Sequence, residues 1–318
     1  MPAIRPGTKG GVISGWGIAL PEKVLTNHEL AEMMDTSDEW IVARTGIHER
    51  RIGGSTIGLS VESGRQALEM AGLDPSRIDG LVLATTTPDK QWGNAAAVQN
   101  ELGMRCGAFD VNAACSGFVY ALVCGHGLIA MGADRVLVIG TDTLSRITDW
   151  DDRGTAPLFA DGSGAVVIES VDGPGQLLGW DLDADGSLLS ILQAEVGGYI
   201  RMEGKEVFRR AVRIMVDSAE KSMAHAGISA DDVALIVPHQ ANVRIIDAAC
   251  QRLGIPMERA AVVLDKTGNT SSASIPLALA DALDNGRVAN GDLVLFVGFG
   301  GGMTAASCVV RWGGGVDD

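Results

Sequence analysis

Three apolar segments in the first half of the chain resemble three segments in the second half. The pairs occur in the same order along the sequence: Ile78–Thr85 with Asp232–His239, Arg135–Thr141 with Asp292–Phe299, and Asp161–Ile168 with Gly302–Val310. Each segment is a continuous apolar run, which is typical of strands buried on both faces in sheets that helices cover. The repeat therefore predicts two similar halves, each a mixed sheet with helices.

The division between the halves is predicted at a turn-rich segment that starts at Asp172. Asp172-Gly-Pro-Gly lies between two strand signals, and this composition is typical of turns. We therefore expect one unit over residues 1–172 and a second over residues 173–318. Strand and helix signals alternate in both units, so the predicted fold class is α/β. With 318 residues, 46% of them hydrophobic, the chain can bury a large core.

The charge and cysteine content exclude several classes of protein. A net charge of −15 argues against a nucleic-acid partner, which a basic surface would have to attract. No uninterrupted apolar run approaches the roughly 18 residues of a membrane span, so no membrane association is expected. The first ten residues contain no apolar signal-peptide region. Five cysteines, an odd number without paired spacing, indicate a reducing cytoplasm.

Three polar motifs each place one reactive side chain directly after an apolar run. These side chains are the thiol of Cys115, the imidazole of His239 and the carboxamide of Asn269. Ligands bind at the carboxyl ends of strands in α/β sheets, so the three are candidates for one site. Cys115 also opens a predicted helix, whose N-terminus would favour a thiolate that attacks thioesters. The set provides a nucleophile and two hydrogen-bond donors, with no metal indicated.

Two further segments indicate how substrates could be held. The glycine-rich segment Gly298–Thr304 lacks the Gly-Lys-Ser/Thr of a phosphate loop, and it predicts a tight turn that directs a backbone N–H at a reacting oxygen. A helix is predicted from about Glu206 to His225. Its arginines at positions 209, 210 and 213 share one basic ridge, because residues three and four apart are neighbours on a helix.

Taken together, the motifs resemble the β-ketoacyl-acyl-carrier-protein synthase III family of the thiolase superfamily. The resemblance runs from about Gly11 to Trp312, and it includes Thr36–Ile47, Asp152–Thr155 and Met202–Arg209 besides the three reactive motifs. It implies a thiolase-like fold with layered α-β-α-β-α architecture and a homodimer. It also implies that coenzyme A enters as a thioester substrate and that no cofactor is required.

The resemblance assigns a role to each reactive group. Cys115 is the nucleophile that an acyl-CoA acylates. His239 and Asn269 promote the decarboxylation of malonyl-acyl carrier protein and hold the enolate oxygen. The backbone N–H groups of Cys115 and Gly301 form the oxyanion hole, and Phe299 lies beside the malonyl carboxylate. The implied product is the 3-ketoacyl thioester that starts fatty-acid synthesis.

The resemblance also implies three sets of binding residues. Positions that line the coenzyme A channel are Trp40, Arg44, Arg153, Gly204, Phe208 and Asn242. The basic face that receives the acidic carrier protein contains Arg209, Arg244 and Arg252, so a local basic surface would serve an acidic enzyme. Trp92 lies in a segment that crosses the dimer interface and shapes the partner's acyl pocket, where its bulk favours a short acyl primer.

Other functions remain open from the sequence. A specialised condensing enzyme or acyltransferase of polyketide or secondary metabolism would use the same three reactive residues. A catalytically silent protein that only binds the carrier is disfavoured because all three are present. Chain-elongating synthases have a second His where this chain has Asn269. A thiolase would need a second reactive Cys, and the strand-like setting of Cys308 favours packing instead.

Overall fold

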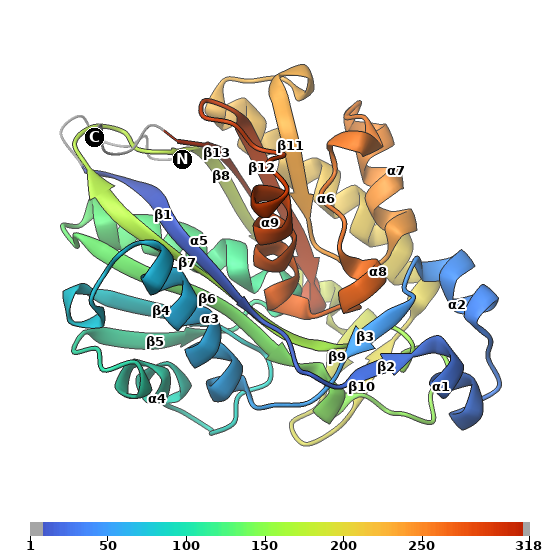
Figure 1. The fold of residues 1–318 in the computed structure, drawn as a ribbon. Helices are drawn as coiled ribbons and strands as arrows, with labels where there is room; N and C mark the ends of the chain where they lie inside the picture. The colour runs from blue at the N-terminus through green and yellow to red at the C-terminus, as the bar shows by residue number, and fades with distance from the viewer. Residues whose placement is uncertain (1–8, 314–318) are drawn as a thin grey trace.

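Two sheets with the same strand pattern form the centre of the computed structural model, which describes residues 9–313 (Figure 1). The ends of the two predicted units, residues 1–8 and 314–318, lie outside the described residues. The first sheet has the order β1 (Gly10–Ala19), β7 (Asp161–Val171), β6 (Arg135–Thr143), β4 (Gly80–Ala84) and β5 (Gly107–Val111). The second has the order β8 (Leu177–Ala184), β13 (Thr304–Arg311), β12 (Leu293–Gly300) and β11 (Val233–Pro238).

The strand directions repeat between the sheets. In both, the first three strands pair antiparallel, and the next neighbour, β4 or β11, pairs parallel. The three similar sequence segments form the equivalent strands β4 and β11, β6 and β12, and β7 and β13. These strands are buried over nearly their whole length, as their continuous apolar runs predicted. The chain leaves the first sheet at Val171 and enters the second at Leu177.

Helices cover both sheets and also separate them. On the outer side of the first sheet lie α3 (Thr56–Met70) and α4 (Asn94–Glu101). Between the sheets lie α5 (Gly117–Ala130) and α9 (Ser274–Asp284), whose apolar residues contact both sheets in one central core. The outer side of the second sheet is covered by α6 (Gly204–Ala226) and α7 (Val243–Leu253). The five layers have the predicted α-β-α-β-α order.

A small unit of two helices and a hairpin extends from the layered body beside the second half (Figure 1). It contains the hairpin of β2 (Val24–Thr26) and β3 (Glu49–Arg51), together with α1 (Asn27–Met33) and α2 (Asp38–Thr45). Thr26 caps α1 in a reciprocal capping box with Glu29, and Ser37 caps α2. A second hairpin, β9 (Leu192–Ala194) and β10 (Ile200–Met202), lies in front of the reactive site.

Two equivalent tight turns open the central helices. The 3₁₀ turn η2 (Ala114–Ser116) leads into α5, and η7 (Ser271–Ala273) leads into α9. Ala114 and Ser271 have φ values of 47° and 50°, and they are the non-glycine residues with positive φ in the part of the chain that the structure describes. Such values strain an L-residue, so each turn is held by its surroundings. Within residues 9–313, no helix is both long and apolar enough to cross a membrane.

Candidate active site

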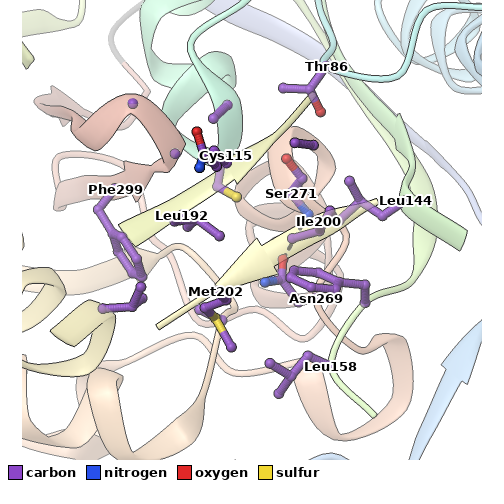
Figure 2. Close-up of a pocket in the computed structure, with 18 of the residues that line it drawn as sticks. Thr86, Cys115, Leu144, Leu158, Leu192, Ile200, Met202, Asn269, Ser271 and Phe299 are labelled. Atoms are coloured by element: carbon purple, nitrogen blue, oxygen red, sulfur yellow. Dashed lines mark hydrogen bonds between the residues drawn. The ribbon is translucent and has the colours of Figure 1, made fainter. Parts of the chain in front are cut away.

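The predicted reactive residues face one cavity of about 470 Å³ (Figure 2). Cys115 lies in η2 after β5, and His239 follows β11 directly. Asn269 lies between the short helix α8 (Leu264–Thr267) and η7. All three line the cavity, although they are far apart in the sequence. The pseudo-repeat contributes to this meeting, because the equivalent turns η2 and η7, one from each half, contact each other beside the cavity.

The backbone around Cys115 is packed against the glycine turn that follows β12. A Cβ atom on Gly300 would lie 2.6 Å from the Cys115 nitrogen and 2.8 Å from the Ala114 Cβ, so only glycine fits there. Gly301 is the next residue, and it opens the 3₁₀ turn η8 (Gly301–Met303) on the cavity wall. The predicted tight turn therefore brings the backbone of Gly301 next to the backbone of the nucleophile.

Burial determines the protonation state of the Cys115 thiol. Desolvation raises the pKa of Cys115, a hydrogen bond from Ser271 lowers it and the nearby Asp142 carboxylate raises it, and together these effects bring the pKa to about 12. The sequence prediction of a thiolate favoured by a helix N-terminus was therefore wrong for the resting enzyme. The regular helix α5 begins only at Gly117, and desolvation outweighs the effect of its dipole.

His239 is held as a neutral imidazole in one tautomer. Its side chain is 1% exposed, and burial lowers its pKa to about 3. The Nδ1 atom lies 2.7 Å from Ser274 Oγ, which also accepts the backbone N–H of Gln240 at 3.3 Å. The Ser274 hydroxyl hydrogen is then free to be donated to Nδ1, because a backbone N–H can only donate. A hydroxyl that donates to Nδ1 in this way puts the imidazole proton on Nε2, the atom that remains for the cavity.

The orientation of the Asn269 carboxamide follows from the same reasoning. Its Oδ1 accepts the backbone N–H of Ser271 at 2.9 Å, which leaves the Nδ2 hydrogens for the cavity. The backbone of Asn269 is fixed on both sides, because its N–H donates to the Leu158 carbonyl and its carbonyl accepts from Ala160, each at 2.9 Å. With the imidazole proton on Nε2, His239 and Asn269 direct two N–H donors to the cavity.

The rest of the cavity wall is mostly apolar. Phe299 is 2% exposed and packs edge-on against the His239 ring, with 5.4 Å between ring centroids. A small hydrophobic cluster, separate from the main cores, surrounds the space in front of Cys115 and includes the β9–β10 hairpin (Figure 2). Its members that line the cavity are Leu144, Ile147, Leu158, Phe159, Leu192 and Ile200. This part of the cavity suits a hydrocarbon chain.

The residues predicted to contact coenzyme A form two neighbouring groups. Gly204, Phe208 and Asn242 line the cavity itself. Trp40, Arg44 and Arg153 lie outside its wall, where the guanidinium carbons of the two arginines lie 4.7 and 4.4 Å from the centroid of the Trp40 ring. The two groups are connected, because the Asn242 side chain donates to the Arg44 carbonyl at 2.9 Å.

The predicted carrier-binding arginines are exposed on α6 and α7. Arg209 pairs with Glu206 at 2.8 Å, and the Arg244 guanidinium lies 5.6 Å from the ring centroid of the cavity residue Phe208. Arg252 lies in the last turn of α7, farther along the helix. Trp92 is 82% exposed and does not line the cavity of its own chain within the described residues.

Sequence reasoning missed several buried polar residues behind the site. Ser274 forms a hydrogen bond with His239 Nδ1, and the fully buried Asp142 binds both the Thr85–Thr87 segment and the Ser272 backbone N–H. In the sequence, each of these residues is only a polar position in an otherwise apolar strand or at the start of an apolar helix. Such a pattern does not indicate which residue the side chain contacts. In the described part of the chain, no cluster of three or more His, Cys, Asp or Glu side chains could hold a metal ion.

Comparisons with known proteins agree with this geometry. Two family models match: 3-oxoacyl-[acyl-carrier-protein] synthase III over residues 109–186, and its C-terminal counterpart over residues 223–312. The β-ketoacyl-[acyl-carrier-protein] synthase III of Roseiflexus castenholzii is 47% identical over 95% of this chain and 98% of its own. The chain belongs to the β-ketoacyl-acyl-carrier-protein synthase III family. Members are condensing acyltransferases, so the predicted enzyme class and thiolase fold are confirmed.

Solved structures place the chain within this family. The 3-oxoacyl-[acyl-carrier-protein] synthase III of Aquifex aeolicus has a TM-score of 0.93 and 44% identity, covering 95% of this chain and all of its own. The priming β-ketosynthase of the R1128 polyketide pathway has a TM-score of 0.90 and 35% identity, and the match covers 98% of this chain and 99% of its own. The fold is thus shared by both functional branches that the sequence left open, whereas the sequence is more similar to the fatty-acid enzymes.

Proposed function

We propose that this protein joins a short acyl group from acyl-CoA to malonyl-acyl carrier protein, with loss of carbon dioxide, and so starts fatty-acid chains. The observation that carries the proposal is the meeting of Cys115 with two N–H donors, from His239 and Asn269, in one largely apolar cavity. A nucleophile alone would support acyl transfer. The two additional donors are what an enolate oxygen requires.

In the first half-reaction, the Cys115 sulfur attacks the thioester carbonyl of acyl-CoA. The backbone N–H groups of Cys115 and Gly301 hold the oxyanion, and coenzyme A leaves as the thiol after taking the thiol proton. Because the cysteine begins as a neutral thiol, proton removal must accompany the attack. The acyl chain then extends along the apolar cluster around Leu144, Phe159 and Ile200.

In the second half-reaction, the malonyl thioester loses its carboxylate as carbon dioxide. The electron pair of the broken bond forms an enolate, whose oxygen accepts from His239 Nε2–H and Asn269 Nδ2–H. The enolate carbon then attacks the acyl-Cys115 carbonyl, a carbon–carbon bond forms, and the Cys115 thiolate leaves and takes a proton from water to restore the thiol. No base has to remove a proton from carbon, which agrees with two neutral donors in place of a base.

Substrate access is proposed at the mouth formed by α2, α6 and α7. Trp40, with Arg44 and Arg153 around its ring, offers a stacking and cationic site for the nucleotide end of coenzyme A. Arg209, Arg244 and Arg252 would receive the acidic carrier protein on exposed faces of α6 and α7. This local basic surface accounts for acidic-partner binding by a chain with a net charge of −15.

A homodimer is proposed from the edge of the first sheet. The edge strand β5 is largely exposed and carries Phe109 with 43% of its surface accessible, beside the loop that carries the exposed Trp92. An exposed edge with apolar residues favours pairing with a second copy. In such a dimer Trp92 would approach the partner's acyl pocket and favour a short primer. The odd number of cysteines, all free, agrees with a cytoplasmic location.

The test is intact-mass spectrometry of the protein after exposure to a panel of acyl-CoAs, followed by malonyl-acyl carrier protein. We expect an adduct on Cys115 that disappears in the chase and yields a 3-ketoacyl product, and the adduct mass identifies the primer. An adduct that persists would favour the second candidate, a specialised acyltransferase of polyketide or secondary metabolism. That candidate is represented by the relative of 35% identity. No adduct with any thioester would refute the nucleophile assignment.

A further inference from the structure

Arg50 is a buried cation that forms no ion pair with the described residues. It lies in the middle of β3, its side chain is fully buried, and its guanidinium donates to three neutral oxygens. These acceptors are the carbonyls of Leu25 at 3.0 Å and Pro157 at 3.1 Å, and Asn27 Oδ1 at 2.6 Å. Among the described residues no carboxylate lies within the 4.0 Å of an ion pair, and its Nε has no hydrogen-bond partner.

This arrangement is costly for stability. Removing a cation from water without an ion-pair partner is costly, and burial lowers the pKa of Arg50 to about 10 although the Glu49 and Glu29 carboxylates act in the opposite direction. An apolar side chain of similar volume would avoid the buried charge, but it would leave these three oxygen acceptors without a donor. Packing alone therefore does not explain an arginine here, and the geometry of its three hydrogen bonds indicates what it contributes.

One of those bonds leads directly to the Asn269 backbone. Arg50 holds the Pro157 carbonyl, and the residues that follow, Leu158 and Ala160, bind both backbone groups of Asn269 at 2.9 Å. Arg50 also supports the preceding residue, since a Cβ atom on Gly268 would lie 2.9 Å from the Arg50 Cβ. Pro157 does not line the cavity, whereas the next residue, Leu158, does, so Arg50 holds this segment from behind the cavity wall.

The other end of the guanidinium is anchored in the small unit of α1 and α2. Asn27 accepts from Arg50 and donates through its Nδ2 to Asp38 Oδ1 and to the Ile47 carbonyl, each at 2.8 Å. Asn27 is 1% exposed, so its orientation is fixed by these three partners. The guanidinium thus has a rigid support on one side and the segment beside Asn269 on the other.

We propose that Arg50 is a positioning residue for the condensation half-reaction. Arg50 holds the Asn269 backbone so that the Asn269 carboxamide faces the enolate oxygen. The inference rests on the proposed function, because it assigns Arg50 to one of that reaction's two donors. Cys115 and His239 are held by other contacts, to the turn after β12 and to Ser274. Loss of Arg50 should therefore affect the two half-reactions unequally.

The experiment measures the half-reactions separately in Arg50→Met, which removes the donors and keeps most of the volume. Acylation of Cys115 by acyl-CoA is followed by quenched intact mass, and condensation by the loss of that adduct with malonyl-acyl carrier protein. We expect acylation within about 3-fold of wild type and condensation slower by roughly 30-fold or more, because small displacements of a catalytic group cost up to about 100-fold. Equal losses in both steps would reduce Arg50 to a structural role.

A double-mutant cycle tests whether Arg50 acts through Asn269. In an Asn269→Ala background, Arg50→Met should slow condensation by less than about 2-fold further, because the group that it positions is already absent. An undiminished additional loss would overturn the proposal. Where Arg50→Met does not fold, Arg50→Lys carries the same cycle, since it keeps the charge but replaces the planar donor with a single ammonium.

The control is Arg287→Met, at an exposed arginine. Arg287 also donates to backbone carbonyls, those of Glu258 and Ala260, but neither residue lines the cavity. Both half-reactions should keep wild-type rates in this variant. A wild-type enzyme that forms no Cys115 adduct would instead refute the proposed function itself, so the two failures are distinguishable.

Discussion

The turns that open α5 and α9 share a backbone and differ in chemistry. In the first, Ala114 has a φ of 47° and its N–H lies 3.4 Å from Asn112 Oδ1. In the second, Ser271 has a φ of 50° and its N–H lies 2.9 Å from Asn269 Oδ1. Cys115 thus corresponds to Ser272, one residue after the strained position in each half.

The difference shows how a repeated fold acquires two functions at one site. Both turns bring an Asn to the cavity wall, but Asn112 is exposed and Asn269 is 5% exposed. The first turn exposes its thiol to the cavity, whereas Ser272 Oγ points back to the Ala114 carbonyl at 3.1 Å. The shared backbone supplies the frame, and burial decides which side chain of each turn can react.

The largest expected difference in activity is between variants of the equivalent residues Cys115 and Ser272. Cys115→Ala should abolish the acyl adduct and lower turnover by at least about 10⁴-fold, since the nucleophile is lost. Ser272→Ala should keep the adduct and lose about 1 kcal/mol of unfolding free energy with the hydrogen bond to Ala114. Intact mass and steady-state rates test both variants. An adduct that survives in Cys115→Ala would place the nucleophile elsewhere.

The second comparison is between the two asparagines. Asn269→Ala should leave acylation measurable and slow condensation by about 10²–10³-fold, as for the removal of one oxyanion donor. The fold-decrease in the condensation rate for Asn112→Ala should be at least about ten times smaller than for Asn269→Ala, because the Asn112 side chain is exposed. Single-turnover chase of the acylated enzymes measures this difference. Equal losses would mean that both turns contribute donors to the enolate.

The sequence predicted the parts of this molecule that periodicity and strand order determine. The segments at Ile78 and Asp232 predicted equivalent strands, and three polar motifs pointed to Cys115, His239 and Asn269, which line one cavity. It did not predict Ser274, which lies 35 residues from His239, nor the partners of Arg50, because such contacts depend on how loops pack. The direction of the Cys115 pKa shift also required the structure, since desolvation and the helix dipole act oppositely.

The third prediction compares the helices that follow the turns. α5 contains the buried His126, whose Nε2 has no hydrogen-bond partner among the described residues, whereas α9 contains no histidine. Burial lowers the pKa of His126 to about 4, below the value of about 6.5 in the unfolded chain. The unfolded state therefore binds more protons between these pH values. The contribution of the neutral His126 to the free energy of unfolding is therefore complete above about pH 6.5, and it declines as the pH falls towards 4.

His126→Leu should make the free energy of unfolding less sensitive to acid. Between pH 7.5 and 5, the variant should lose about 2 kcal/mol less than the wild type, and His239 accounts for part of the loss that remains. Urea unfolding at several pH values measures the difference, and exposed His28→Gln is the control. An unchanged pH dependence in His126→Leu would show that this histidine does not govern acid sensitivity.

The smallest expected effect concerns the strain that both turns share. A positive φ costs an L-residue about 1 kcal/mol or more, whereas glycine adopts it freely but loses more entropy on folding. Ala114→Gly should therefore raise the unfolding free energy by at most about 1 kcal/mol. Ser271→Gly should gain less, because the Ser271 hydroxyl also bonds to Cys115. Urea midpoints at constant slope measure both variants. A loss in Ala114→Gly would mean that the packing of its methyl group on Gly300 outweighs the strain, and that the two turns, alike in backbone, are stabilised by different contacts.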